Sequence, residues 1–137
     1  MRYLGLDLGA RSLGIAISDR TGLIASFYKS IRYDSEDKLL SDLEKIIKDE
    51  NVDKIVLGYP KNMDNSEGPR CEKTRAYKER LEKRFPAIPV ILWDERLSTV
   101  AADRSLMEAS VSAAKRKQVI DKMAAVHILQ GYLNSVK

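Results

Sequence analysis

The fold of this chain is decided by its opening stretch, which reads Tyr3-Leu4-Gly5-Leu6-Asp7-Leu8-Gly9-Ala10-Arg11-Ser12-Leu13-Gly14-Ile15-Ala16-Ile17-Ser18-Asp19. A short apolar run carries one carboxylate, Asp7, and the chain then turns back through Gly9 and Gly14 into a second apolar run. This pattern predicts two strands joined by a tight turn. A carboxylate within an apolar strand is costly unless a cation, a metal ion or a metal-bound phosphate compensates its charge. Asp7 is therefore the first candidate functional residue.

The composition is that of an ordinary globular protein with a mild basic excess. The 137 residues are 44% hydrophobic and 32% charged, and the formal net charge is +4. This length fits one domain, residues 1–137, with a core that needs no disulfide or structural metal. The charge suits a polyanionic partner without requiring one, because many soluble proteins carry a similar excess.

Cysteine and histidine are too scarce for several classes of site. Cys71 is the only cysteine and His127 is the only histidine. An internal disulfide and a thiolate zinc site are therefore excluded, as are metal sites built mainly on histidine. No apolar segment reaches membrane-spanning length, and no long apolar run precedes the first charged residues. We expect a protein of the reducing cytoplasm.

Hydrophobic periodicity divides the chain into strands and helices. Alternating or continuous apolar runs predict strands over residues 3–8, 13–18, 23–33, 54–58 and 89–93. Apolar residues at helical spacing predict helices over residues 35–50, 70–85, 98–107 and 112–133. This order is typical of an antiparallel three-strand meander joined to parallel strand–helix units. The expected fold class is α/β, with a mixed five-stranded sheet and helices on both of its faces.

Three carboxylates from distant parts of the chain are candidate catalytic and metal-binding residues. Asp7 lies on the first strand, Glu95 follows the last predicted strand, and Asp121 lies on the final helix. Ligands of open α/β sheets bind beyond the carboxyl ends of the strands, so Asp7 and Glu95 are expected at one edge. The alanines that follow Asp121 let its helix approach the sheet closely. Grouped carboxylates bind Mg²⁺ or Mn²⁺, and two such ions about 3.5–4 Å apart promote phosphodiester cleavage.

Each of these acids also has a simpler explanation. Asp7 could accept hydrogen bonds from the turn that follows it, and spacing alone does not separate this role from metal binding. Glu95 could pair with Arg96, and Asp121 could pair with Lys117 one helical turn earlier. Only a joint placement of the three acids favours catalysis.

Five motifs, taken in order, give the chain a resemblance to a known family. They are Leu4-Gly5-Leu6-Asp7-Leu8-Gly9 with Gly14 and Ser18-Asp19; Gly58-Tyr59-Pro60-Lys61-Asn62-Met63; Gly68-Pro69-Arg70; Asp94-Glu95-Arg96-Leu97-Ser98-Thr99; and Asp121-Lys122-Met123-Ala124-Ala125 continuing to Ile128-Leu129-Gln130. Over essentially its whole length the chain is similar to the YqgF family, also called RuvX, of RNase H-like nucleases.

The resemblance implies an RNase H-like fold and metal-dependent cleavage of a nucleic-acid backbone. It implies Mg²⁺ or Mn²⁺ as the cofactor and processing of the 5′ end of pre-16S rRNA, a step of ribosome biogenesis, as the function. The acidic positions of the family fall on Asp7, Glu95 and Asp121. Members are also known as Holliday junction resolvases, so branched DNA is the alternative substrate, and the chain could act as a monomer or a homodimer.

One departure from the fold family concerns the fourth strand. Nucleases with the RNase H fold carry an acid at or near the end of this strand, where the present chain has Gly58-Tyr59-Pro60. Glu95 would have to take that place. The sequence therefore leaves open whether the site holds one metal ion or two.

Two other classes of function fit the same residues. An Asp-x-Gly motif followed by a glycine-containing hairpin also opens the phosphate-binding motif of sugar kinases and actin, which clamp ATP between two domains. The second class is a nucleic-acid-binding module, which would bind through the basic residues and catalyse no reaction. Tight ATP binding with hydrolysis would favour the first alternative. For the second, equal nuclease activity in an Asp7→Asn variant would point to a contaminant or to a non-catalytic role.

Basic residues near the acids are candidates for nucleic-acid binding. Such residues neutralise phosphates and supply affinity with little sequence choice. For the consecutive basic residues of the last helix, a solvated helix face is an equally open explanation. Tyr59, beside Pro60, is a candidate for stacking on a nucleotide. The candidate phosphate-binding residues are Arg11, Lys61, Arg70, Arg96, Lys115, Arg116 and Lys117.

Overall fold

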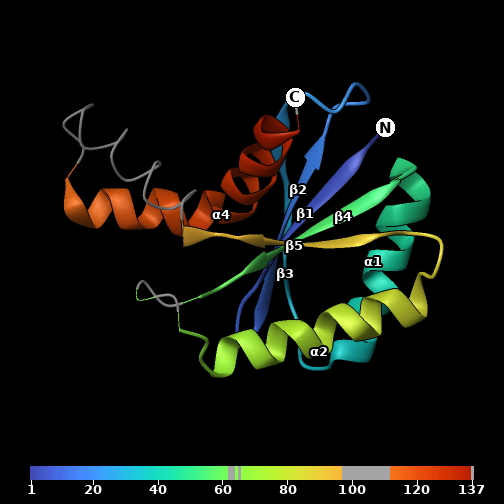
Figure 1. The fold of residues 1–137 in the computed structure, drawn as a ribbon, viewed down its shortest axis with the longest axis horizontal. Helices are drawn as coiled ribbons and strands as arrows, with labels where there is room; N and C mark the ends of the chain where they lie inside the picture. The colour runs from blue at the N-terminus through green and yellow to red at the C-terminus, as the bar shows by residue number, and fades with distance from the viewer. Residues whose placement is uncertain (62–63, 65, 97–111, 137) are drawn as a thin grey trace.

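The computed structural model describes residues 1–61, 64, 66–96 and 112–136. The described strands form one mixed sheet in the order β3-β2-β1-β4-β5 (Figure 1). An antiparallel meander consists of β1 (Tyr3–Leu8), β2 (Ser12–Ser18) and β3 (Ala25–Arg32). Two parallel strands, β4 (Lys54–Tyr59) and β5 (Val90–Asp94), extend the sheet beyond β1. The mixed five-stranded sheet predicted from the sequence is confirmed.

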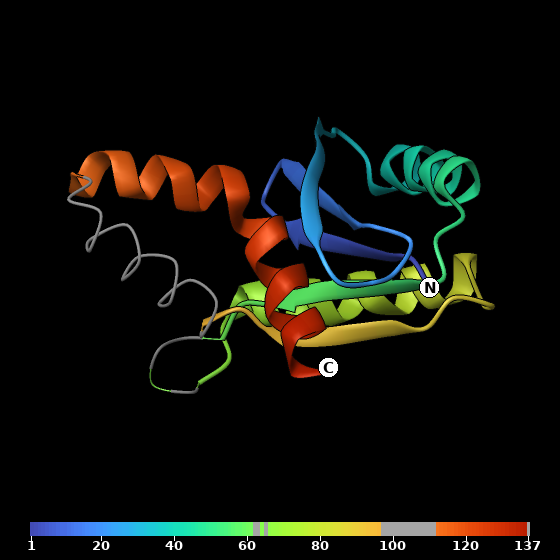
Figure 2. The same cartoon turned by 90° about the horizontal axis from the view of Figure 1, so that it is seen from above.

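Helices cover both faces of this sheet (Figures 1 and 2). On one face, α1 (Glu36–Glu50) and α2 (Pro69–Arg84) share a hydrophobic core with alternate residues of β1, β2 and β4. On the other face, the C-terminal half of α4 (Ala113–Ser135) packs on the sheet, and its N-terminal half projects beyond the carboxyl end of β5 (Figure 2). The helix predicted over residues 98–107 lies outside the described residues. No described helix combines the length and the apolar character needed to cross a membrane.

The ends of α1 follow from local sequence signals. The side chain of Ser35 accepts a hydrogen bond from the backbone N–H of Lys38 at 3.2 Å, which caps the first turn as predicted. Asn51 ends the helix in the left-handed region with a φ of 52°. The helix turns its apolar stripe to the sheet, and the buried residues of that stripe are Leu39, Leu40, Leu43, Ile46 and Ile47.

The start of β3 differs from the prediction. The apolar residues Leu23 and Ile24 were expected in the strand, but β3 begins at Ala25. The backbone N–H groups of Leu23 and Ile24 donate instead to Oδ1 of Asp19, at 2.9 and 3.0 Å. The carboxylate therefore stabilises the turn between β2 and β3, in which the carbonyl oxygen of Ile24 also accepts from the backbone N–H of Asp19 at 3.0 Å.

Helix α4 approaches β1 so closely that Gly5 has no room for a side chain. A Cβ at Gly5 would lie 2.7 Å from the Cβ of Leu129 and 3.0 Å from the carbonyl oxygen of Ala125. Glycine at this position therefore sets the distance between α4 and the strand that carries Asp7.

The variant Gly5→Ala tests this contact. We expect it to lower the free energy of unfolding by about 1–3 kcal/mol, because the added methyl group forces α4 away from the sheet. Gly14→Ala is the matched control on β2, because a Cβ there would meet the Cβ of Ala125 at an ordinary 3.7 Å. Urea denaturation followed by circular dichroism measures both variants. Equal stability of the two variants would contradict the assigned role of Gly5.

Candidate functional site

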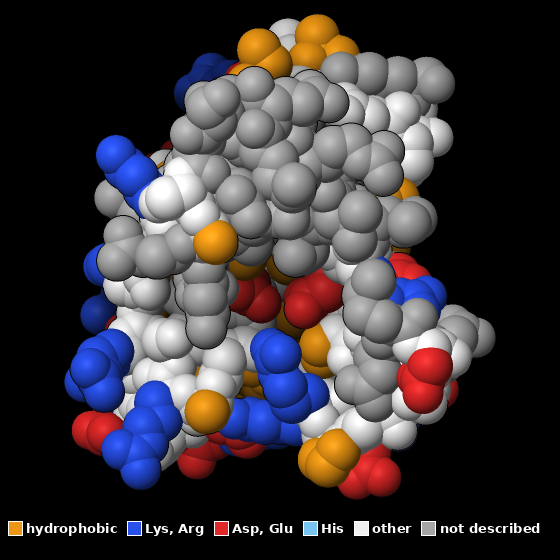
Figure 3. Space-filling model, turned by 90° about the vertical axis from the view of Figure 1, so that its left-hand side faces the viewer, with side chains coloured by type: hydrophobic (Ala, Val, Ile, Leu, Met, Phe, Trp, Pro, Cys, Tyr) orange, Lys and Arg blue, Asp and Glu red, His pale blue; other side chains and the backbone are white. Residues whose placement is uncertain are grey.

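The two acids predicted at the carboxyl edge of the sheet lie close to each other. Asp7 is near the end of β1, and Glu95 directly follows β5. Both strands run parallel to β4, which lies between them, so their carboxyl ends share one edge. The negative charge of Asp7 acts on the carboxyl group of Glu95. Viewed from this edge, acidic side chains gather near the centre of the face, next to a group of Lys and Arg side chains (Figure 3).

Glu95 fits into space that Gly58 leaves open at the end of β4. A Cβ on Gly58 would lie only 2.7 Å from Oε2 of Glu95 and 2.5 Å from Cδ1 of Ile128. The backbone N–H of Glu95 also donates to the carbonyl oxygen of Tyr59, at 3.3 Å, which ties Glu95 to the end of β4. The fourth strand carries no acid of its own, and the carboxylate of Glu95 lies beside its end.

The carboxyl group of Glu95 has a strongly perturbed pKa. Burial, followed by the negative charge of Asp7, raises the pKa of Glu95 to about 7; Asp94 adds to this shift, and the positive charge of Arg70 opposes it. Buried acids with a like-charged neighbour in a cleft are typical of functional sites. A cation between the two carboxylates would favour the ionised form of both.

Glu95→Gln is expected to stabilise the protein above neutral pH when divalent ions are chelated. Folding raises the pKa of this group from its ordinary 4.5 to about 7, so the folded state binds the extra proton between these two values. Glu95 therefore lowers the free energy of unfolding increasingly as the pH rises through this window, and the effect reaches its full size above it. The variant should gain on the order of 2 kcal/mol near pH 8 and almost nothing near pH 4.

Urea titrations of the wild type and the variant in EDTA, at both pH values, measure this difference. A stability gain that is the same at both pH values would contradict the assigned burial and charge repulsion at Glu95.

The third predicted acid, Asp121, lies on α4, and its side chain is outside the described part of the structure. The helical turn that follows it contacts the site. The Cβ of Ala125, four residues later, is 3.7 Å from the Cβ position of Gly14, which is itself 3.7 Å from the Cβ of Asp7. Among the described side chains, no group of three or more His, Cys, Asp and Glu residues forms a candidate metal cluster. The convergence of three acids stays a prediction.

Two of the predicted phosphate-binding residues lie beside the acids. Arg70, at the exposed start of α2, is near enough for its charge to lower the pKa of Glu95. Arg96 follows Glu95 and pairs with Asp94, with Nε 2.9 Å from Oδ1 and Nη2 2.6 Å from Oδ2. This forked pairing orients the guanidinium and holds the pKa of Asp94 below its usual range.

The other predicted basic residues are spread over two regions. Arg11 is exposed in the turn between β1 and β2, and Lys61 is half-buried just after β4. Lys115 is exposed near the start of α4, and the side chains of Arg116 and Lys117 lie outside the described part of the chain.

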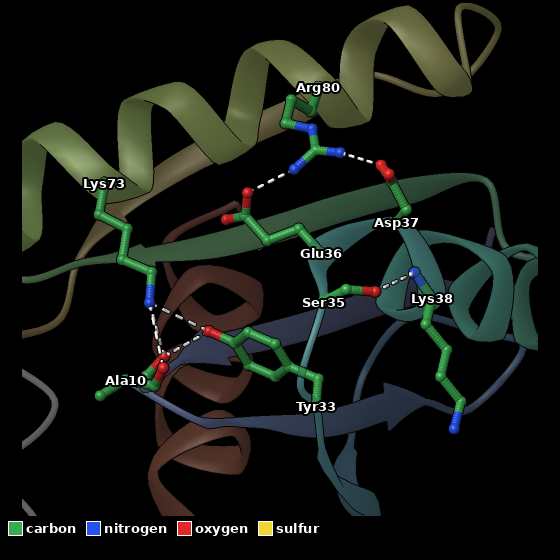
Figure 4. A network of polar contacts seen from close by, with 9 residues as sticks. Ala10, Tyr33, Ser35, Glu36, Asp37, Lys38, Lys73 and Arg80 are labelled. Atoms are coloured by element: carbon green, nitrogen blue, oxygen red, sulfur yellow. Dashed lines mark hydrogen bonds and ion pairs between the residues drawn. The ribbon is translucent and has the colours of Figure 1, made fainter.

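The turn after Asp7 is held by two residues that the sequence analysis did not single out (Figure 4). The hydroxyl of Tyr33 donates to the carbonyl oxygen of Gly9 at 2.7 Å. The ammonium group of Lys73, from α2, lies 3.3 Å from the carbonyl oxygen of Ala10 and 3.1 Å from the hydroxyl of Tyr33. These bonds tie the β1–β2 turn to α2 and so fix the end of the strand that carries Asp7. No local spacing predicts them, because the partners are distant in the sequence.

The prediction that Tyr59 stacks on a nucleotide is wrong. Its side chain is buried, and its hydroxyl group bonds to Glu67 and Arg75. Tyr59 therefore anchors the segment that connects β4 with α2.

Two solved structures share this fold. T. thermophilus RuvC in complex with a Holliday junction substrate aligns over 99% of this chain and 95% of its own, with a TM-score of 0.61 and 13% sequence identity. The Holliday junction resolvase of fowlpox virus aligns over 98% of this chain and 99% of its own, with a TM-score of 0.57 and 14% identity. The fold is thus the RNase H-like fold of the RuvC-type resolvases, as the sequence predicts.

Sequence similarity identifies the family, whereas the structural likeness shows only the fold. The chain belongs to the RuvX family, described as Holliday junction resolvase, whose profile matches residues 1–135. A Staphylococcus epidermidis protein named "Putative pre-16S rRNA nuclease" is 54% identical over 138 residues, which cover 99% of this chain and 97% of that protein. A Staphylococcus aureus protein of the same name is 55% identical over 137 residues, covering 98% and 96%.

Proposed function

We propose that this protein is a metal-dependent nuclease that hydrolyses phosphodiester bonds at the 5′ end of pre-16S rRNA, in the cytoplasm. The observation that carries the proposal is the pair of acids at the carboxyl edge of the sheet. Asp7 and Glu95 come from separate strands and lie close enough for one charge to raise the pKa of the other. Membership of the RuvX family supports nuclease activity, and the names of the relatives support the choice of substrate.

The donor atoms fit a hard divalent cation. Carboxylate oxygens are preferred ligands of Mg²⁺ and Mn²⁺, and a cation offsets the repulsion between Asp7 and Glu95. We assign Asp121 as the third ligand, because the turn of α4 that follows it packs against Gly14, the partner of Asp7 in the sheet. When bound, such an ion supplies an activated water and stabilises the charge that develops on the departing oxygen.

Basic residues around the acids bind and orient the nucleic-acid backbone in this proposal. Arg70 and Arg96 contact phosphates next to the acids, and Asp94 holds the guanidinium of Arg96 in a fixed orientation. The N-terminal half of α4 projects beyond the sheet and contacts the substrate farther from the cut (Figure 2). These contacts provide affinity with little choice of sequence. The remaining phosphate-binding residues are Arg11, Lys61, Lys115, Arg116 and Lys117.

Branched DNA is the second candidate substrate. The RuvX family is described as Holliday junction resolvase, and the RuvC structure with this fold is a complex with a Holliday junction. The acids serve the same hydrolysis on either substrate, so a direct comparison of cleavage decides between them.

Asp7→Asn tests the catalytic role of the first acid. We expect cleavage to fall by at least about 100-fold, because a neutral amide binds a divalent cation poorly, while nucleic-acid binding persists. The assay incubates purified protein with Mg²⁺ or Mn²⁺ on 5′-extended 16S precursor RNA and on a four-way DNA junction. Asp34→Asn, at an exposed position between β3 and α1, is the matched control. Full cleavage by the Asp7→Asn variant would refute the catalytic role of Asp7 and would point to a contaminating nuclease.

Gly58→Ala tests the position of Glu95 without changing Glu95 itself. We expect cleavage to fall by about 10–100-fold, because the added methyl group displaces the carboxylate from its place beside β4. The same methyl group also meets Cδ1 of Ile128. The double variant Gly58→Ala, Ile128→Val lacks this Cδ1 atom, so it should recover part of the lost stability but not cleavage. Recovery of cleavage in the double variant would show that displacement of Glu95 is not the cause of the loss.

A further inference from the structure

A cleft opens beside Asp7 on the face of the sheet that α4 partly covers. Its volume is about 240 Å³. It is bordered by Asp7 on β1, Gly14 on β2, Phe27 and Ser30 on β3, and Ala125 on α4. The cleft therefore runs from the proposed catalytic acid away from Glu95, toward the β3 edge of the sheet.

The cleft exists because the residues next to Asp7 across the sheet are small. Asp7 pairs with Gly14, and Gly14 pairs with Ser30, so the three residues form one row across three strands. Directly paired residues present their side chains on the same face of a sheet. Glycine has no side chain and serine has a short one, and among the described side chains of α4 the one that borders this row is Ala125. The row therefore forms the floor of an open cleft and is not filled by core side chains.

A β-bulge turns Phe27 onto this face. Lys29 pairs with Ile15, whereas Phe27 pairs with the next residue, Ala16, so Tyr28 is the extra residue of β3. Regular alternation would put Phe27 on the same face as Lys29, and the bulge moves it to the opposite face. Tyr28 packs against the core beneath α1 and α2 instead. Bulges are frequent beside active sites, where they redirect a side chain.

Phe27 is an exposed aromatic residue next to the proposed site of cleavage. Its exposed fraction is 41%, although its partner Ala16 is fully buried. Proteins bind unpaired bases by stacking them on exposed aromatic rings. Tyr59, which the sequence suggested for this role, is buried, and Phe27 borders the same cleft as Asp7.

We propose that this cleft binds one unpaired nucleobase of the substrate, stacked on the ring of Phe27, next to the phosphodiester at Asp7. The inference rests on the proposed nuclease function and adds that the cut strand is single-stranded at this point. A volume of about 240 Å³ is enough for one planar heterocycle. The lining residues that the structure describes include no Lys or Arg, and Ser12 and Ser30 supply their hydroxyl groups, so stacking is expected to contribute more than base-specific recognition.

Binding measured in EDTA tests the cleft separately from cleavage. The probes are a fluorescein-labelled single-stranded RNA and an abasic strand with the same number of phosphates, and fluorescence anisotropy gives the Kd. We expect Phe27→Ala to bind the base-bearing RNA about tenfold more weakly and the abasic strand unchanged. Phe27→Tyr keeps the ring and should bind like the wild type. Ile24→Ala truncates another exposed apolar residue, outside the cleft, and should alter neither Kd.

A second variant blocks the cleft and leaves Phe27 in place. Ser30→Ile puts a branched side chain on the floor, and it should weaken binding of the base-bearing RNA alone. The dependence of log Kd on log salt should be the same in all variants, because the phosphate contacts are unchanged. Equal weakening of both strands by Phe27→Ala, or no effect of either variant, would overturn the proposal.

The two proposals fail in different ways. One outcome is that Phe27 makes the wild type bind the base-bearing RNA more tightly than the abasic strand, but the protein does not cleave with Mg²⁺ or Mn²⁺. This outcome would support the cleft and refute the nuclease function. Wild-type protein that cleaves, with a KM that Phe27→Ala and Ser30→Ile leave unchanged, would support the nuclease function and refute the cleft.

Discussion

The contact between α4 and β1 over Gly5 is the constraint on which the geometry of the site depends. Because no Cβ separates the two elements, the backbone of α4 at Ala125 lies directly against the strand. The same helical turn then packs against Gly14, beside Asp7. The turn before it carries Asp121, so the reach of the proposed third acid is set by the depth to which the helix sinks into the sheet. A bulkier residue at position 5 would move α4, and with it Asp121, although position 5 itself lies outside the site.

Two glycines shape the site by making room for different groups. Gly5 admits a helix, whereas Gly58 admits the carboxylate of Glu95 beside the end of β4. The second arrangement places a half-buried acid next to Asp7, and the negative charges of the two groups repel each other in the folded chain. Strain of this kind is common where groups are arranged to bind a ligand that relieves it. The clamp formed by Tyr33 and Lys73 keeps the β1–β2 turn in place despite that repulsion.

The sequence predicts the sheet, its order of elements and two of the acids, because these depend on periodicity and on the rule that parallel strands share a carboxyl edge. It misplaces the start of β3, because Leu23 and Ile24 are apolar and fit a strand pattern. The pattern does not reveal that their N–H groups donate to Asp19. It also misses Phe27, because a bulge arises from the pairing of two strands and leaves no local pattern. It also favours Tyr59 for stacking, because no local pattern shows that its side chain is buried and that its hydroxyl group bonds to Glu67 and Arg75.

The lone cysteine gives the molecule an internal reporter. Cys71 lies fully buried in the first turn of α2, where its sulfur is 3.4 Å from the carbonyl oxygen of Pro60. A thiol reacts with alkylating reagents only when it is exposed and ionised. Modification therefore requires a local opening that exposes the first turn of α2, and the reaction rate depends on how often this opening occurs. Thiol chemistry can thus follow openings next to the acids without any introduced label.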